Sequence, residues 1–356
     1  MGSRRKKEKL FKMNKKQFMI LALLTVASVI AAVLVLTAGK GRFSGGKVAF
    51  SGGGVPPFDV NAVTSISIEN TRARLKIEKK NGMWIVPSRA GYPANFQLIS
   101  DFVTTIRNVR VVRSLEPQKK YWRTYGVDLS SGNRETTTVS FFDSNRGVLA
   151  SLIMGDMYFT PGTRASDQQP AGRYLLSNTK GALPFLAGVS FTDASPNPKM
   201  WLDKDFLKFQ ASSILSVKSI ASSGKLNWEF RKVSGKEDFT LSNPPKGKAV
   251  SVNKIRKYIR GLSELSFDDV SLRKDGKFPG MTNFASVAIE SGGAFYELKV
   301  GTEKGKYLMT VVKRSAPGQP ESQSFFSKWV YEISPAMADS LNPGKDFFSI
   351  GQESGE

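Results

Sequence analysis

The sequence predicts an α+β protein, with an amino-terminal transmembrane helix followed by two tandem, similar α+β modules whose sheets are largely antiparallel. Three observations lead to this prediction. Phe18–Thr37 is a run of twenty residues without a charged side chain. Short runs of alternating apolar and polar residues, separated by turn residues, fill the chain after residue 58. The order of these runs occurs twice, at offsets between 146 and 157 residues.

The apolar run is long enough to cross a bilayer, because a helix of this length spans about 30 Å. Residues 1–17 before it carry eight basic side chains and one acidic one. This asymmetry predicts a cytoplasmic segment at residues 1–17 and a transmembrane helix at residues 18–38. The rest of the chain is then expected on the periplasmic side of a bacterial inner membrane.

A cleaved signal peptide is the alternative interpretation of the same stretch. The apolar part of a signal peptide is only about 7 to 15 residues long and ends at a small-x-small site. The nearest match here, Thr37-Ala38-Gly39, is a poor one. The length of the run therefore favours a retained, single-pass anchor.

The composition excludes several kinds of chemistry. The chain has no Cys and no His, which rules out disulfides, thiol nucleophiles and triads of the Ser-His-Asp kind. Histidine is also the commonest protein ligand of transition metals. Carboxylate chemistry, a Ser-Lys pair or no chemistry remain, and we expect a protein that is not an enzyme and has no cofactor and no metal.

The net charge of +22 points to anionic partners. The first 17 residues supply seven of these charges, which leaves +15 for the part expected outside the membrane. A basic exterior favours contact with anionic lipid, with an anionic polymer of the cell envelope or with an acidic protein surface. Nucleic acid is not expected in this compartment.

The first module is predicted over residues 58–203, after a flexible tether rich in Gly and Ser at residues 39–57. Asn81-Gly82 lies between two alternating runs and predicts a β-hairpin, because both central positions of the tight turn need a positive φ. A helix is predicted from a cap at Asn95 to Val109, where apolar residues recur at spacings of three and four. Further strands are expected at residues 63–69, 75–79, 83–86, 110–115, 136–142, 148–154 and 173–176, with a short helix after Asn178.

The second module is predicted over residues 204–350, with a tail at residues 351–356. Its helix, predicted over Val252–Leu265, follows the helix of the first module at a constant offset of 156 residues. The run Tyr331–Ile333 is matched with Tyr174–Leu176, so the helix that begins after Ser334 is matched with the one expected after Asn178. Insertions in surface loops explain the variation of the other offsets.

Several short motifs of this chain resemble those of a bacterial family of domains of unknown function, DUF4340. They are Trp84 with Pro87, Tyr125-Gly126, Gly155, Tyr174-Leu175 and Trp201-Leu202-Asp203-Lys204, while Val127 stands where the family often has Leu. The resemblance implies a single-anchor envelope protein whose gene neighbours those of a gliding-motility-type ABC transporter. It implies no catalytic residues, because the family has none assigned.

Basic and aromatic residues gather just after the first predicted helix and form the candidate binding site. Guanidinium groups and aromatic rings in such a cluster could dock an anionic polymer or an acidic partner surface. The alternative is a solvated helix end whose aromatic side chains pack inward. The members of the cluster are Arg107, Arg110, Arg113, Lys119, Lys120, Tyr121, Trp122 and Arg123.

Two pairs of carboxylates are candidates for acid/base or metal sites, namely Asp203 with Asp205 and Asp268 with Asp269. Neither pair extends into the alternating oxygen ligands of a calcium loop. We expect structural roles for them, and no deep pocket lined by paired carboxylates. The tryptophans Trp84, Trp201, Trp228 and Trp329 are expected in the module cores.

The function expected from the sequence is that of a non-catalytic, membrane-anchored accessory or scaffold protein of a membrane complex, associated with an ABC-type transporter. A binder of anionic cell-envelope polymer is the alternative. An envelope hydrolase that uses carboxylates or a Ser-Lys pair fits least well.

Overall fold

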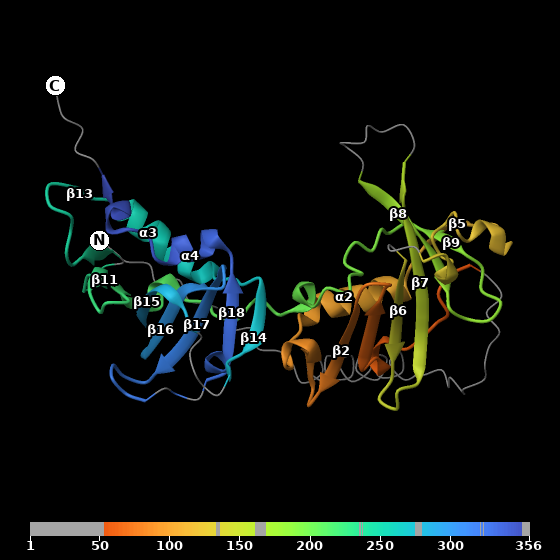
Figure 1. Ribbon diagram of the computed structural model, residues 1–356, viewed down its shortest axis with the longest axis horizontal. Helices are drawn as coiled ribbons and strands as arrows, with labels where there is room; N and C mark the ends of the chain where they lie inside the picture. Colours follow the sequence, from red (N-terminus) through yellow and green to blue (C-terminus); the bar gives the residue numbers. More distant parts are fainter. Residues whose placement is uncertain are drawn as a thin grey trace, which may run out of the picture. The chain divides into compact units, whose positions relative to one another are not determined.

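The computed structural model describes residues 53–132, 136–160, 169–234, 236, 238–274, 280–320, 322 and 324–350. The predicted cytoplasmic segment, transmembrane helix and terminal tail, and residues 39–52 of the tether, lie outside this part. None of the helices among the described residues is long and apolar enough to cross a membrane. The described part consists of two large sheets, one small sheet and a few helices (Figure 1).

The first sheet has nine strands among the described residues, in the order β4-β3-β2-β1-β6-β7-β8-β9-β5, and every pairing is antiparallel. Among the described residues of this half of the chain there is one α-helix, α2 (Phe96–Arg107). The strands are β1 (Ser65–Glu69), β2 (Arg74–Lys80), β3 (Met83–Val86), β4 (Tyr92–Pro93), β5 (Val111–Ser114), β6 (Thr137–Phe142), β7 (Val148–Phe159), β8 (Pro170–Ser177) and β9 (Phe185–Ala187).

The second sheet has eight described strands in the order β12-β11-β10-β15-β16-β17-β18-β14, again all antiparallel. Its helices are α3 (Val252–Gly261) and α4 (Pro335–Leu341), and β13 (Ala249–Val250) pairs with β19 (Ser349–Ile350) in the small sheet. The strands of the large sheet are β10 (Ile214–Ala221), β11 (Leu226–Lys232), β12 (Phe239–Leu241), β14 (Asp269–Leu272), β15 (Thr282–Ser291), β16 (Ala294–Glu303), β17 (Lys306–Arg314) and β18 (Trp329–Ile333).

The two sheets share one strand order. If β1, β2 and β3 are matched with β10, β11 and β12, and β5 to β9 with β14 to β18, both sheets read the same, and β4 is an additional edge strand of the first. The helix also follows the first hairpin strands in both halves. This agreement confirms the prediction of two similar modules with antiparallel sheets. We call the first sheet with α2 the first module and the second sheet with α3 and α4 the second module; the boundaries at residues 58, 203 and 350 stay predictions.

The predicted match at the end of the modules is wrong. Tyr331 lies on β18, whose counterpart is β9, whereas Tyr174 lies on β8, the counterpart of β17. The helix expected after Asn178 is also absent, and residues there turn into β9 instead. The physical reason is that Phe185 and Ala187 are fully buried when β9 pairs with β8, a gain that a short helix on the surface would not offer.

The local predictions for the hairpin and the helix caps are confirmed. Asn81 and Gly82 have φ of 50° and 82°, and Lys80 pairs with Met83 across the turn. The Asn95 side chain accepts a hydrogen bond from the Leu98 N–H at 3.0 Å, which caps α2. Ser334 caps α4 in the same way, with 3.1 Å between its hydroxyl and the Met337 nitrogen.

The helices α2 and α3 each bury one face against aromatic side chains. On α2, Phe102 packs edge-on against Trp201, with 5.2 Å between ring centroids. On α3, Tyr258 packs edge-on against Trp228 at 5.2 Å, and its hydroxyl donates to the Leu341 carbonyl at 2.9 Å. Trp84, Trp201, Trp228 and Trp329 are all buried, which confirms them as core residues.

Candidate functional site

The predicted basic cluster lies around β5, the last strand of the first sheet, and the segment that follows it. Arg110 directly precedes β5 and Arg113 lies within it, and Lys119 and Lys120 lie on a short 3-10 helix, Lys119–Tyr121. Together with Arg123 these five cations are exposed. None of the five forms a salt bridge with another residue in the part of the chain that the structure describes. We call Arg110, Arg113, Lys119, Lys120, Arg123, Tyr121 and Trp122 the basic surface.

Aromatic rings lie next to two of these cations. The Lys120 Nζ is 4.8 Å from the centroid of the Tyr121 ring, and the Lys119 Nζ is 5.8 Å from that of Trp122. Both distances fall in the range in which a ring face attracts a cation. The two lysines are thus held over rings but keep their charge available to a partner.

Trp122 and its neighbours fix this segment to the sheet. Trp122, Tyr125 and Tyr174 pack against a small separate core of Val127, Ile153, Leu176 and Ala182. Ile153 and Leu176 alternate along their strands with Leu152, Met154 and Leu175, which belong to the main core. Because successive side chains of a strand point to opposite faces, the segment covers the other face of the first sheet. Trp122 and Tyr125 therefore pack inward, as one interpretation of the sequence expected, while Tyr121 and the cations stay outside.

Two glycines let the same segment approach β7 closely. The Asp156 N–H donates to the Tyr125 carbonyl at 3.0 Å, and a Cβ on Gly155 would lie 2.1 Å from that oxygen. Gly126 has a φ of +66°, and the Thr136 hydroxyl donates to its carbonyl at 2.5 Å. Tyr125-Gly126 and Gly155, read in the sequence only as family motifs, thus form one backbone contact that positions the basic surface.

Arg107 differs from the other members of the predicted cluster. Its Nε donates to the Phe58 carbonyl at 2.9 Å, and its side chain is half-buried. It ties the end of α2 to the start of the first module, so we leave it out of the basic surface.

Tyr174 lies beside Arg113 and stays neutral. Burial raises the pKa of Tyr174 above its usual range, and the positive charge of Arg113 opposes this rise only in part. Its ring also contacts Tyr125, with 5.2 Å between centroids. The basic surface therefore continues into a neutral aromatic patch on β8.

A second candidate site lies where residues of the two modules meet, and sequence reasoning singled out only Asp269 among its residues. Arg89, at the end of a 3-10 helix (Pro87–Arg89), donates from Nε to Asp269 Oδ1 at 2.5 Å and from Nη2 to Oδ2 at 3.0 Å. Lys199 Nζ lies 3.5 Å from Asp269 and 3.6 Å from Glu332, and Lys306 Nζ lies 2.6 Å from Glu332. These residues, except Lys199, line a cleft of about 760 Å³, which we call the junction cleft.

Two carboxylates, Asp269 and Glu332, line the junction cleft, and the expectation that no deep pocket is lined by paired carboxylates stays a prediction. Asp269 on β14 and Glu332 on β18 are direct neighbours in register, a proximity that only strand pairing creates. Burial works to raise the pKa of Asp269, but hydrogen bonds from Arg89 and the Val270 N–H, with the charges of Arg89 and Lys199, leave it below its usual range. An ionised carboxylate that already binds two cations is a poor general acid. The pair is better suited to holding the modules together.

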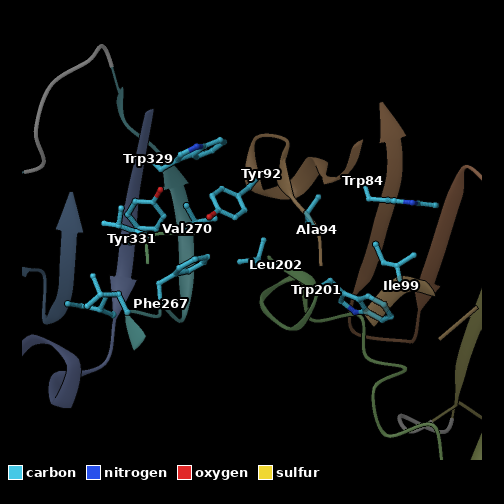
Figure 2. Packing of buried hydrophobic residues seen from close by; sticks show 14 of the residues in the cluster. Trp84, Tyr92, Ala94, Ile99, Trp201, Leu202, Phe267, Val270, Trp329 and Tyr331 are labelled. Carbon is cyan, nitrogen blue, oxygen red and sulfur yellow. The ribbon is translucent and has the colours of Figure 1, made fainter. Parts of the chain in front are cut away.

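Tyr92 joins the modules beside this cleft. Its ring, on β4, lies 5.0 Å from Trp329, 5.5 Å from Phe267 and 6.4 Å from Tyr331, all residues of the second module. Figure 2 shows Tyr92 directed toward these three side chains. Burial raises the pKa of Tyr92 well above its usual range, and the charge of Asp203 adds to the rise. The ring therefore acts as a neutral, 1% exposed apolar anchor.

The connection between the modules is held by backbone pairing. Ala94 and Leu202 form an antiparallel bridge, and the Asn95 N–H donates to the Trp201 carbonyl at 2.8 Å. Asp203 donates its N–H to the Pro93 carbonyl, and its side chain accepts from the Asp205 N–H at 3.1 Å. Asp203 therefore has the structural role expected of it. Among the described residues, no group of three or more acidic side chains could hold a metal ion.

The comparison with protein families identifies the chain. A family model described as a domain of unknown function, DUF4340, matches residues 84–279, more than half of the chain. The chain belongs to the DUF4340 family. The matched residues contain the Tyr125-Gly126 contact with Gly155 and the Arg89–Asp269 pair, whereas Trp329, Tyr331 and Glu332 of the junction lie outside them. No curated protein and no solved structure matches this DUF4340 chain.

Proposed function

We propose that this DUF4340 protein is a non-catalytic accessory or scaffold subunit of a membrane complex in the bacterial inner membrane. In this proposal a helix at residues 18–38 is its single anchor, the amino terminus is cytoplasmic, and both modules lie on the periplasmic side. The partner is a membrane-complex protein of the ABC-transporter type. The uncharged run of membrane length and the basic residues before it support the anchor and its orientation.

The basic surface is the observation that carries the proposal of partner binding. Its five cations have no salt bridge among the described residues, so an acidic partner need not first break an internal ion pair. The segment is also preorganised, because Trp122 and the Tyr125–Asp156 hydrogen bond hold it on the sheet. Preorganisation lowers the entropy lost on binding, and exposed positive charge steers an acidic partner.

The junction supports a scaffold in a different way. Tyr92, Arg89 and the backbone bridge at Leu202 connect the modules through apolar, ionic and hydrogen-bonded contacts at once. Such a junction suits a scaffold protein that holds its binding surfaces at a fixed distance from one another. The carboxylates Asp269 and Glu332, which a hydrolase would need free, bind Arg89, Lys199 and Lys306 instead.

The test is co-purification of the full-length protein in a mild detergent, with mass spectrometry of what accompanies it. The variant carries Arg110→Glu, Arg113→Glu and Lys120→Glu. The control carries the same change of charge at three exposed residues of another part of the first module, Arg72→Glu, Lys79→Glu and Lys80→Glu. We expect the variant to lose a partner that the control retains, and any residual binding to depend less on salt. Retention of every partner at unchanged salt dependence would refute the proposal.

Binding of an anionic cell-envelope polymer is the second candidate, favoured by the lysines that lie over Tyr121 and Trp122. Its test is retention of the same proteins on isolated cell wall at increasing salt concentration. If the variant elutes early and yet keeps every protein partner, the polymer is the ligand of the basic surface.

A further inference from the structure

The free edge of β5 indicates which backbone conformation a bound partner segment would have. β5 is the terminal strand of the first sheet, with β9 on one side and no described strand on the other. Such an edge presents backbone N–H and C=O groups that can pair with another chain. Val112 in its middle is 60% exposed.

The second module shows how this position is used elsewhere in the same protein. The counterpart of β5 is β14, also a terminal strand. The 3-10 helix Pro87–Arg89 contacts β14, and Arg89 binds its first residue, Asp269. The terminal strand of the second module therefore already holds another segment of the chain through an ion pair at its start.

The charges at the two edges are opposite. Two acids, Asp268 and Asp269, stand at the start of β14, and a basic side chain meets the second of them. β5 is preceded by Arg110 and contains Arg113, neither of which forms a salt bridge within the described residues. Because opposite charges attract across an interface, the basic edge of β5 should bind an acidic segment.

We propose that the edge of β5 binds an extended, acidic segment of a partner protein, which adds to the first sheet as a further strand. Its backbone pairs with β5, and its carboxylates bind Arg110 and Arg113. Main-chain hydrogen bonds supply affinity in such strand addition, and side chains supply specificity. The inference rests on the proposed function of the basic surface, and it adds the chemical class and the conformation of the partner.

The test uses the full-length protein in non-ionic detergent micelles and a fluorescent peptide of alternating Glu and Val. A second peptide has the same sequence but carries N-methyl groups on alternate residues, which removes the donors on its pairing edge and keeps its charge. We expect the methylated peptide to bind at least about tenfold more weakly, because several backbone hydrogen bonds are lost. Equal binding of the two peptides would overturn strand addition, yet it would leave charge-dependent partner binding, and with it the proposed function, intact.

The matching protein variant is Arg110→Glu with Arg113→Glu, and its control is Arg72→Glu with Lys80→Glu, checked by circular dichroism for unchanged folding. Only the first should weaken binding of the unmethylated peptide, by about tenfold or more. If the first variant binds the peptide as tightly as before but associates with itself, the arginines only protect the edge from aggregation, and the proposal fails. Absence of peptide binding by the unchanged full-length chain would overturn it as well.

Discussion

Because Gly155 has no side chain, the segment around Tyr125 and Val127 can lie close against β7. A Cβ there would lie 2.1 Å from the Tyr125 carbonyl and 2.8 Å from a Val127 methyl group. We expect Gly155→Ala to lower the free energy of unfolding by about 2 to 4 kcal/mol, because backbone must move to relieve the clash. Urea unfolding measures the loss.

Gly261→Ala is the control for this prediction. Gly261 is the last residue of α3 and nothing lies within 4 Å of its added Cβ. Alanine should therefore be neutral or stabilise the protein by up to about 1 kcal/mol. If Gly155→Ala were as harmless as Gly261→Ala, the close approach of Tyr125 to β7 would not matter for stability.

Asp269 is a residue whose charge contributes to stability, and its contribution depends on pH. Its folded-state pKa lies below the unfolded value, so the unfolded state binds more protons as the pH falls through this range. The stabilisation is complete above the unfolded pKa, near 3.9, and is lost as the pH falls through the folded pKa. Asp269→Asn should cost about 1 to 3 kcal/mol at pH 7 and less near pH 3, which lies below the unfolded pKa.

Urea unfolding of both proteins at the two pH values tests this prediction. Asp205→Asn is the matched control, since Asp205 forms an exposed pair with Lys208 and such pairs contribute at most about 1 kcal/mol. A cost of Asp269→Asn that does not change between pH 7 and pH 3 would show that the carboxylate charge plays no part.

At the scale of elements, the short strand β4 has a larger effect than its two residues suggest. It has no counterpart in the second sheet, and it places Tyr92 among Phe267, Trp329 and Tyr331. We expect Tyr92→Ala to cost about 3 to 5 kcal/mol, because it leaves a cavity in an aromatic cluster. The same variant should expose the connection to trypsin at Lys204 and Lys208.

Limited proteolysis followed by mass spectrometry reads out that cleavage. Phe96→Ala serves as the control, because Phe96 is 64% exposed at the start of α2. It should change neither the cleavage pattern nor the stability by more than about 0.5 kcal/mol. A Tyr92→Ala protein that resists trypsin like the unchanged protein would mean that the ion pairs of Arg89 and Lys199 and the backbone bridge at Leu202 suffice to hold the modules together.

For the whole molecule, the proposed anchor predicts a topology. A reporter enzyme that is active only in the periplasm should be active when it is fused after Glu356, and one that is active only in the cytoplasm should not. The mature protein should still begin within residues 1–17. An amino terminus found near Lys40 would instead identify a cleaved signal peptide.

The sequence by itself determined the elements that depend on neighbouring residues. Asn81-Gly82 predicted the hairpin, Asn95 and Ser334 predicted helix starts, and the periodicity of apolar residues predicted the faces of α2 and α3. These features follow from local sterics and hydrogen bonding, which are the same in any fold. The duplication was visible as well, because both modules bury the same pattern of strands.

Only the tertiary structure decided which distant residues meet. The sequence alone matched β18 with β8, because both carry a Tyr and apolar neighbours, whereas strand order makes β9 the counterpart. The tertiary structure also separated Arg107 from the basic surface, and it brought Asp269 next to Glu332 and Arg89. Such contacts arise from pairing and packing between segments far apart in the chain, where burial of apolar area outweighs local preference.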